Sequence, residues 1–257
     1  MLLTYVISGF AVGLLVGMTG VGGGSLMTPL LTLLFGVSPS VAVGTDLAFA
    51  SITKSAGTFT HRLRGTVRWD IVRRLCVGAL PAAVVATLAL KHYGTLDQQI
   101  SQLIRYSIAG SVLLTVVALM FKGKMMIWIH AHPERQLQGR ALTCATVAAG
   151  AVLGTLVTIS SIGAGAIGAT LLVLLYPKLS SAEVAGTDIA YAVPLTAIAA
   201  FGHWWLGSIN WELLSMLLLG SLPGITLGSW LARAVPERFL RGLLAMTLTG
   251  VAAKLIY

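Results

Sequence analysis

Long apolar stretches separated by short polar or glycine-rich segments run through this sequence of 257 residues. Most of them have the roughly 20 residues that an α-helix needs to cross the ~30 Å hydrocarbon core of a bilayer. Two, at about 25–37 and 166–176, are short for a crossing, so whether they cross or re-enter stays open. The pattern predicts an all-α polytopic membrane protein with about ten membrane segments. The expected segments are about 2–20, 25–37, 41–60, 73–90, 100–121, 141–159, 166–176, 183–202, one that ends near 232, and 237–256.

Two prolines mark local features of these segments. Thr28 followed by Pro29 suits a helix start, with the threonine as the N-cap and the proline in the first helical position. Pro194 lies inside the eighth segment. It predicts an interruption there, because proline has no backbone N–H to donate and its ring clashes with the preceding turn.

The order of the segments repeats after 142 residues, most visibly in Gly44-Thr45-Asp46 and Gly186-Thr187-Asp188. Two apolar chains match by chance in Leu and Ala, but not in Gly, Asp, His, Trp and Pro in one register. We therefore expect a tandem duplication, with a first five-segment repeat at 1–121, a linker at 122–140 and a second five-segment repeat at 141–257. Further pairs in this register are Gly23 and Gly165, Thr28 and Thr170, His61 and His203, Trp69 and Trp211, and Pro81 and Pro223.

The distribution of basic residues predicts how the two halves are oriented. The loop 61–74 is rich in arginine, whereas its repeat counterpart 203–216 has neither lysine nor arginine. Because cytoplasmic loops carry an excess of Lys and Arg, we expect 61–74 and the basic linker 122–140 in the cytoplasm. The loop 203–216 and both chain termini are then expected outside. This arrangement is an inverted-topology repeat of two five-segment halves, which is typical of secondary transporters.

Composition favours the lipid bilayer as the surroundings of this chain. Only 10% of the residues are charged and 56% are hydrophobic, whereas about a quarter of a soluble domain is charged. The N-terminus lacks the basic region of a cleaved signal peptide, so we expect the first helix to stay. The net charge of +9 comes from loops between apolar segments, so we expect the cell inner membrane as the location and no nucleic acid as a partner.

Nothing in the sequence points to catalysis or to a metal. Cys76 and Cys144 lie in apolar stretches and are expected to be small buried residues. No metal-ligand spacing is present, and no segment holds a nucleophile beside a base. We therefore expect neither an enzyme nor a bound metal or cofactor. The sequence makes no prediction about the oligomeric state.

Two glycine-rich breaks lie at corresponding places in the halves, at 20–24 and 160–165. Inverted repeats place the substrate site where broken helices meet near the midplane. Glycine lets backbone N–H groups approach a ligand, and the helix start behind it carries about half a positive charge. The breaks therefore predict an anion site, although glycines that only allow tight helix packing are the alternative. The candidate substrate-binding residues are Thr19, Gly22, Gly23, Gly24, Ser25, Lys54, Ser160, Ser161, Gly163 and Gly165.

Three of the charged residues inside the expected membrane segments are candidates for the chemistry of the site. Asp46 and Asp188 are repeat counterparts, and membrane-embedded carboxylates usually serve ions, protons or an internal partner. Their alternative role is structural, as caps of the first turn of their own helices. Lys54 has Thr196 as its counterpart, so its charge occurs in one half alone. It is expected to contact an anion, to pair with a carboxylate such as Asp188, or to extend to the membrane surface.

Histidines end two matching segments, His61 in the first half and His203 in the second. Because histidine titrates near neutral pH, the pair could relay protons. The alternative is that both side chains simply face water at the ends of their helices.

Several short motifs are spread over both halves of the chain. They are Gly20-Val-Gly-Gly-Gly24 with Pro29, Gly36-Val37, Ala42-Val43-Gly44-Thr45-Asp46-Leu47, Ile52-Thr53-Lys54, His61-x-x-x-Gly65-x-Val67-x-Trp69, Gly186-Thr187-Asp188 and Gly207-Ser208-Ile209-Asn210-Trp211. Together they resemble the sulfite exporter TauE/SafE family of membrane permeases over nearly the whole chain, except the linker 122–140. The resemblance implies secondary transport of small anions, often sulfur-containing, such as sulfite, sulfoacetate or related organosulfonates, without a cofactor. Many members of the family have Ser or Asn at the positions of Asp46 and Asp188.

The leading hypothesis is thus a secondary transporter of a small anionic substrate that works by alternating access and is coupled to an ion gradient. An anion channel, or a membrane subunit that anchors a partner through 122–140, are the alternatives. The second glycine run is reduced to Gly163-Ala164-Gly165 and lacks a following proline, so the two breaks need not form equivalent parts of the site. The exact substrate, the direction of transport and the coupling ion stay open at this point.

Overall fold

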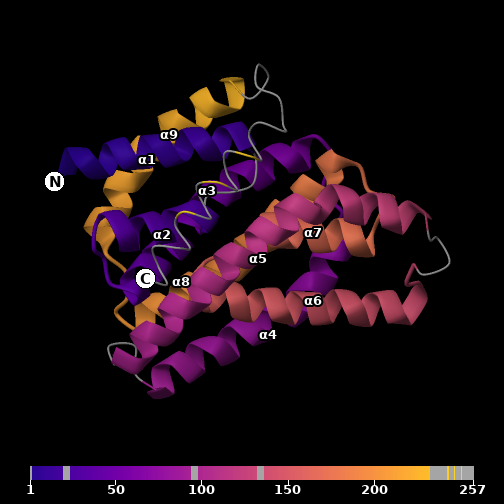
Figure 1. Cartoon of the computed structure of the whole chain (residues 1–257), viewed down its shortest axis with the longest axis horizontal. Helices are drawn as coiled ribbons and strands as arrows, with labels where there is room; N and C mark the ends of the chain where they lie inside the picture. The colour runs from indigo at the N-terminus through magenta and orange to yellow at the C-terminus, as the bar shows by residue number, and fades with distance from the viewer. Residues whose placement is uncertain are drawn as a thin grey trace.

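The computed structural model describes residues 2–19, 24–93, 98–131 and 136–231, together with the single positions 242, 246 and 250. Within these residues every regular element is an α-helix, as the apolar pattern predicts (Figure 1). The helices are α1 (Leu2–Thr19), α2 (Gly24–Leu34), α3 (Pro39–Leu63), α4 (Trp69–Tyr93), α5 (Gln98–Ala131), α6 (Gly139–Ser160), α7 (Ala166–Leu175), α8 (Ser181–Trp205) and α9 (Trp211–Leu231).

Five stretches within the described helices are long and apolar enough to cross a membrane. The helix α3 is 25 residues long but is less apolar, because its interior includes Asp46 and Lys54. Several tryptophans near the ends of helices are exposed, which is typical of residues at a membrane interface. The five stretches are Trp69–Tyr93, Ser101–Phe121, Gly139–Ser160, Ser181–Trp205 and Trp211–Gly228.

The helix α5 is longer than its apolar stretch predicts. It continues from the expected end near residue 121 to Ala131, and so covers the first half of the expected linker 122–140. Lys122 and Lys124 lie in this extension, and lysine is a good helix former, so the helix does not stop where the apolar residues do. The expected last segment, 237–256, falls outside the described residues apart from three positions.

Both proline-based predictions are wrong. The helix α2 begins at Gly24, so Pro29 lies inside it and Thr28 is not its N-cap. The helix α8 runs without a break through Pro194, where Tyr191 and Leu195 are fully buried on either side. Membrane helices tolerate proline because neighbouring groups satisfy the freed backbone atoms and packing holds the helix in place.

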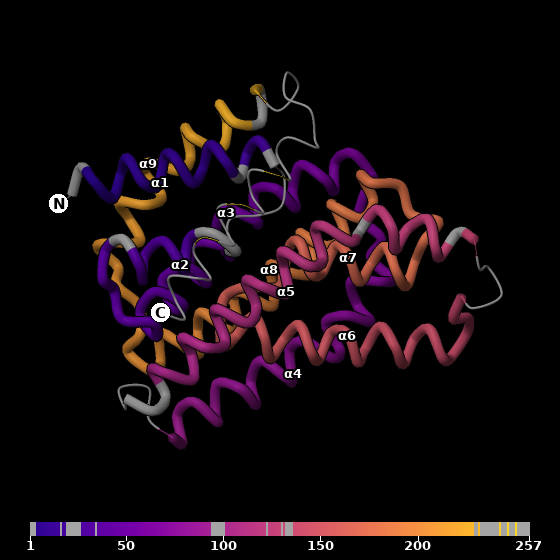
Figure 2. Tube along the Cα trace, viewed as in Figure 1, coloured from indigo at the N-terminus to yellow at the C-terminus, as the bar shows by residue number. Residues whose placement is uncertain are grey.

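Helices α3 and α8 cross at the centre of the molecule and run in opposite directions (Figures 1 and 2). Gly44, near the start of α3, lies against His203 at the end of α8, and Gly57 near the other end of α3 contacts Ile189 near the start of α8. These contacts place Lys54 and its counterpart Thr196 near the midpoint of the crossing. An antiparallel pair of equivalent helices is what an inverted repeat requires.

The flanking helices pack in two equivalent pairs, α1 with α9 and α4 with α6, at opposite edges of the molecule (Figure 1). In each pair the first helix of one half runs along the fourth helix of the other. A Cβ atom on Gly78 of α4 would collide with the Val147 carbonyl of α6, and one on Gly220 of α9 would collide with the Val6 carbonyl of α1. Glycine therefore lets each pair approach backbone to backbone, the close packing common in membrane helices.

The repeated Gly-Thr-Asp motif holds the opposite half at both ends of the α3–α8 crossing. The hydroxyl of Thr187 accepts a hydrogen bond from the Arg68 amide at 3.1 Å, and that of Thr45 accepts one from the Asn210 amide at 3.1 Å. The glycine before each threonine packs on the same opposite loop: Gly186 lies against Thr66, and Gly44 against Ser208. Each half thus contributes a matching contact to the other.

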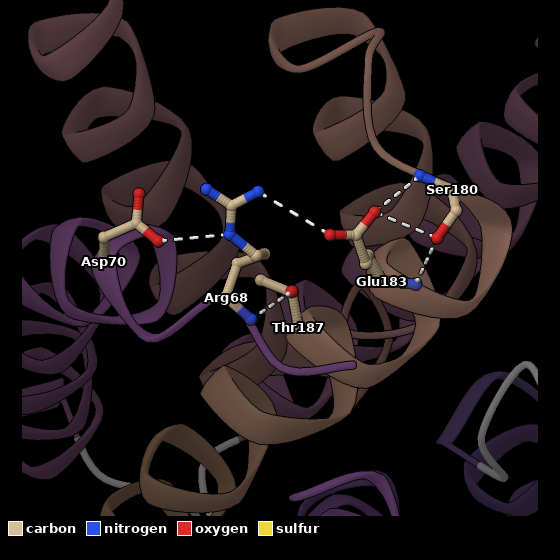
Figure 3. A network of polar contacts seen from close by, with 5 residues as sticks. All are labelled: Arg68, Asp70, Ser180, Glu183 and Thr187. Atoms are coloured by element: carbon tan, nitrogen blue, oxygen red, sulfur yellow. Dashed lines mark hydrogen bonds and ion pairs between the residues drawn. The ribbon is translucent and has the colours of Figure 1, made fainter. Parts of the chain in front are cut away.

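A polar cluster adds to this contact on the side of Arg68 (Figure 3). The Arg68 guanidinium lies 3.6 Å from Asp70 of its own half and 3.6 Å from Glu183 of the other. Glu183 also completes a capping box at the start of α8: its amide donates to Ser180 Oγ, and its carboxylate accepts from the Ser180 amide. At the corresponding place on the opposite side the repeat counterparts are Asn210 and Val41, which cannot form an ion pair.

Candidate functional site

The chain between α6 and α7 is irregular and lies in the interior of the molecule. Ser161, just after α6, has a φ of 58°, and Gly163 and Gly165 have φ values of 139° and 130°. Side chains rarely allow such angles, so these residues end α6 and turn the chain before α7 begins at Ala166. All five residues from 161 to 165 are buried. The break therefore brings backbone polar groups into the core of the protein.

The two serines at this break have different surroundings. Ser160 Oγ donates to the Leu156 carbonyl at 2.7 Å, accepts from the Ile162 amide at 3.2 Å and lies 3.1 Å from Ser111 Oγ of α5. Ser161 Oγ is buried, and it makes no hydrogen bond within the part of the chain that the structure describes. Of the two predicted hydroxyls, that of Ser161 has fewer hydrogen bonds, and it lies close enough to the Asp46 carboxylate to interact with it.

The predicted break of the first half, at 20–24, falls between the end of α1 and the start of α2. Thr19 is the last residue of α1, and Gly24 and Ser25 are the first two residues of α2. The predicted site residues Gly22 and Gly23 lie outside the described residues.

Lys54 reaches from α3 to the break of the second half. Its side chain is 6% exposed, and its Nζ donates to the Ala164 carbonyl at 3.2 Å. Asp188 and, more weakly, Asp46 interact electrostatically with this ammonium. A lysine so deeply buried does not extend to the membrane surface, so that alternative is wrong. The bond to Ala164 places the Lys54 ammonium at the break of the second half, and its predicted contacts with an anion or with a carboxylate stay predictions.

Asp46 binds the short helix of its own half. Its carboxylate is fully buried, and Oδ2 accepts from the Thr28 amide at 3.2 Å and the Thr28 hydroxyl at 2.6 Å. Because α3 begins at Pro39, Asp46 lies two turns inside the helix and does not cap its first turn. The other oxygen, Oδ1, has no hydrogen-bond partner among the described residues, and the Ser161 hydroxyl of the other half lies close enough to interact with the carboxylate.

Asp188 has the corresponding position against α7. A Cβ atom on Gly168 would collide with Asp188 Oδ1 and would lie 2.8 Å from the Tyr191 hydroxyl, so both side chains press on the backbone of α7. Asp188 does not cap its own helix either, because Ser180 and Glu183 already cap α8. The capping interpretation is therefore wrong for both aspartates. Each lies instead against the short helix behind the break in its own half.

The two histidines lie where the halves meet. His203 is fully buried, and its Nε2 lies 2.9 Å from the Thr158 carbonyl of α6. Because a carbonyl only accepts, Nε2 carries the hydrogen. His61 is partly exposed and its Nδ1 lies 2.8 Å from Thr66 Oγ1. His203 thus does not face water, whereas proton relay through either residue stays a prediction.

Sequence reasoning missed Thr28 and the Ala164 carbonyl as parts of this site. A signal for Thr28 was present, because it matches Thr170 in the repeat register. No local signal could reveal the Ala164 carbonyl, since any residue has one. Its role follows from the turn that the neighbouring glycines impose.

Comparison with known proteins agrees with the architecture. The family described as "Sulfite exporter TauE/SafE" matches residues 5–255. A "Probable membrane transporter protein YjnA" from Bacillus subtilis is 35% identical over 261 residues, which cover 100% of both chains. A second protein from that organism, "Probable membrane transporter protein YdhB", is 26% identical over 93% of each chain. A "Probable membrane transporter protein" from Xylella fastidiosa is 26% identical over 88% of this chain and 82% of its own.

No solved structure matches this chain. The family match spans almost the full sequence, and the relatives that cover both chains almost completely are named as membrane transporters. The helices long and apolar enough to cross a bilayer agree with such a protein. The chain therefore belongs to the sulfite exporter TauE/SafE family of membrane transporters.

Proposed function

We propose that this protein is a secondary transporter of a small sulfur-containing anion, such as sulfite or sulfoacetate, and that it works by alternating access coupled to an ion gradient. The observation that carries the proposal is the bond from the Lys54 ammonium to the Ala164 carbonyl. It fixes a buried cation of one half at the helix break of the other, near the midpoint of the α3–α8 crossing.

Two positive features meet at this place. Ala164 lies two residues before the start of α7, whose first backbone N–H groups and helix dipole favour negative charge. The Lys54 ammonium lies beside them, and the Ser161 hydroxyl is buried in the same break. An anion with several oxygens could accept from the ammonium, the hydroxyl and the amides of the break. We propose that Gly163 and Gly165, with the equivalent Gly22, Gly23 and Gly24 of the other half, keep the backbone accessible for it.

The relation of the halves supports alternating access. Equivalent contacts bind α1 to α9 and α4 to α6, while the equivalent helices α3 and α8 are antiparallel. We propose that 1–121 and 141–257 are inverted repeats whose arrangements exchange during transport. The loop 61–74 and the linker region 122–140 would then face the cytoplasm, and the chain termini the outside.

Flux measurements in proteoliposomes test the proposal. Lys54→Met keeps the length of the side chain but removes the charge. Because a hydrogen bond to a charged group contributes about 1.5–3 kcal/mol, sulfite or sulfoacetate uptake at low concentration should fall by about 10- to 100-fold. Lys178→Met, at an exposed position of the α7–α8 loop, is the control and should keep wild-type flux.

Flux equal to that of protein-free liposomes for every anion tried would contradict the proposal. Flux through the wild-type protein that does not saturate with anion concentration would indicate a channel. Equal uptake by the wild type and Lys54→Met would remove Lys54 from the site, whatever the substrate.

A further inference from the structure

The two repeat-related aspartates differ in how strongly they act on Lys54, although their places in the sequence are equivalent. Of the two carboxylates, Asp188 has the larger electrostatic effect on the buried Lys54 ammonium. Asp46 interacts with Lys54 less strongly, and its hydrogen-bond donors are the amide and the hydroxyl of Thr28. A charge buried in a membrane protein needs a close counter-charge to stay ionised. Asp188 meets this requirement better than Asp46.

One oxygen of Asp46 is available for a proton. Oδ1 is buried and forms no hydrogen bond within the described residues, and the same holds for the nearby Ser161 Oγ. A hydroxyl both donates and accepts. Ser161 could therefore donate to an ionised Oδ1, or accept from Oδ1 once it carries a proton. This pair crosses from the first half to the break of the second, where the anion is proposed to bind.

The charges of the site make binding of a proton to Asp46 depend on binding of the anion. The described centre holds one ammonium, Lys54, and two carboxylates, Asp46 and Asp188. An anion bound beside Lys54 adds negative charge to a site that already has more carboxylates than cations. A proton on Asp46 removes one negative charge and so strengthens anion binding. By linkage, the anion strengthens proton binding by the same factor.

We propose, resting on the proposed function, that Asp46 Oδ1 is the proton-binding site through which this transporter couples the anion to the proton gradient, while Asp188 remains the ionised partner of Lys54. The step is a reversible protonation. An O–H bond forms at Oδ1 with a proton from water while the site is open to one side of the membrane. The bond breaks, and the proton returns to water, once the site is open to the other side. The equivalent aspartates thus have unequal tasks, as often occurs when neighbouring carboxylates differ in their surroundings.

The groups packed around Asp46 support this assignment. Lys54 on its own helix is the charged side chain that acts on it in the described part of the protein. Helix α2 presents the Thr28 hydroxyl, and the chain after α6 presents that of Ser161. From α8 come Asp188, which interacts with the same Lys54, and His203, which packs on Gly44 and bonds the Thr158 carbonyl. From α5 and α9 no described charged side chain acts on Asp46.

The test separates coupling from binding in proteoliposomes that contain the full-length protein. Exchange of radiolabelled sulfite or sulfoacetate is measured at equal pH and equal anion concentration on both sides. Accumulation driven by a pH gradient is measured in parallel, with protein-free liposomes subtracted. Asp46→Asn mimics the protonated carboxyl, so exchange should persist clearly above that of protein-free liposomes. Accumulation above the external concentration should disappear. Glu212→Gln, at an exposed carboxylate, should keep both activities.

Asp188→Asn should behave differently, because Lys54 then lacks its stronger partner. Its exchange should fall by about tenfold or more. The pH profile of sulfoacetate exchange should also separate the two variants, because the charges of sulfoacetate do not change near neutral pH. Wild-type exchange should fall as the pH rises and Asp46 loses its proton, whereas that of Asp46→Asn should stay flat. Gradient-driven accumulation by Asp46→Asn at the wild-type level would overturn the inference. So would a wild type that exchanges the anion but never accumulates it against its gradient.

If Asp46→Asn does not fold, a second measurement on the wild-type protein tests the inference. Proton uptake is followed with a pH dye while sulfoacetate, whose charges do not change near neutral pH, is added to the weakly buffered wild-type protein. Uptake of about one proton per bound anion supports the inference, and binding without proton uptake overturns it. Failure of the proposed function looks different, because the wild type then neither exchanges nor binds any anion tried.

Discussion

In each half, one threonine accepts a hydrogen bond from a loop of the other half. The buried hydroxyls of Thr45 and Thr187 each accept from a backbone amide that directly precedes a helix of the opposite half. Such an amide costs about 1–3 kcal/mol if it is buried without a partner. The three residues of the repeated motif thus have separate tasks: glycine allows the approach, threonine binds the loop, and aspartate faces the short helix of its own half.

Removing one of these hydroxyls should weaken the protein measurably. Thr187→Val keeps the shape of the side chain but leaves the Arg68 amide without its acceptor. Because this hydrogen bond is only partly buried, we expect a loss of about 0.5–1.5 kcal/mol, seen as a lower midpoint of thermal unfolding in detergent. Thr60→Val is the matched control, because Thr60 is exposed and bonds only within its own helix turn, to the Ala56 carbonyl. An equal midpoint for Thr187→Val and Thr60→Val would contradict the role of the hydroxyl.

At the level of helices, the backbone contacts of α4 with α6 and of α1 with α9 depend on small residues. Gly78 and Gly220 occupy equivalent positions in α4 and α9, and each faces a carbonyl of the partner helix. Helices in a bilayer gain nothing from burying apolar area against each other, since lipid is equally apolar, so close packing has to supply the association. The register of these contacts therefore positions α3 and α8 between the two pairs.

A large side chain at such a contact should separate the helices. Gly78→Leu is expected to reduce the yield of monodisperse protein on size-exclusion chromatography by several-fold, because the Val147 and Ala151 backbone cannot give way. Gly110→Leu on α5 is the control, since no atom lies within 4 Å of a Cβ placed there. Wild-type yield for Gly78→Leu would show that α4 and α6 do not need this approach.

For the molecule as a whole, the central proposal is that the halves are inserted in opposite orientations. Leu63, near the end of α3, and its repeat counterpart Trp205, at the end of α8, are both exposed. In a background without Cys76 and Cys144, single cysteines at these positions should react from opposite sides of the membrane. A membrane-impermeant maleimide is expected to label Trp205→Cys in intact cells, but Leu63→Cys only after permeabilisation.

Labelling of both positions from the same side would contradict the inverted arrangement. A well-characterised membrane protein, labelled in the same cells, controls for permeability. It carries a single cysteine either in a periplasmic loop or in a cytoplasmic loop. Labelling in denatured membranes, where both cysteines are accessible, gives the amount of each variant present.

The helices were largely predictable because the features that define them are local. Apolar length and glycine runs gave the segments and the break before α7 to within a few residues. Helix ends were less predictable: α5 continues past its apolar stretch because Lys122 and Lys124 are compatible with a helix. Pro194 failed as an indicator because buried neighbours hold α8 together.

The sequence was enough to select the charged residues of the candidate site, but not to predict their contacts. Membrane-embedded charges are rare enough to identify Asp46, Lys54 and Asp188 from the sequence alone. The carbonyl that Lys54 bonds lies 110 positions away, and only the antiparallel crossing of α3 and α8 brings it close. The different surroundings of the two aspartates also arise from that crossing, because the sequence around them is repeated.

Lys54 lies near the midpoint of the α3–α8 crossing, where two identical copies of a five-helix unit would have to be symmetric. A symmetric dimer of a single five-helix unit has to present the same residue from both sides of its axis. Two ammonium groups would then face each other in a dry interior, where like charges repel strongly. In the predicted duplicate, one copy has Thr196 where the other has the cation of Lys54, an asymmetry that two identical copies could not have.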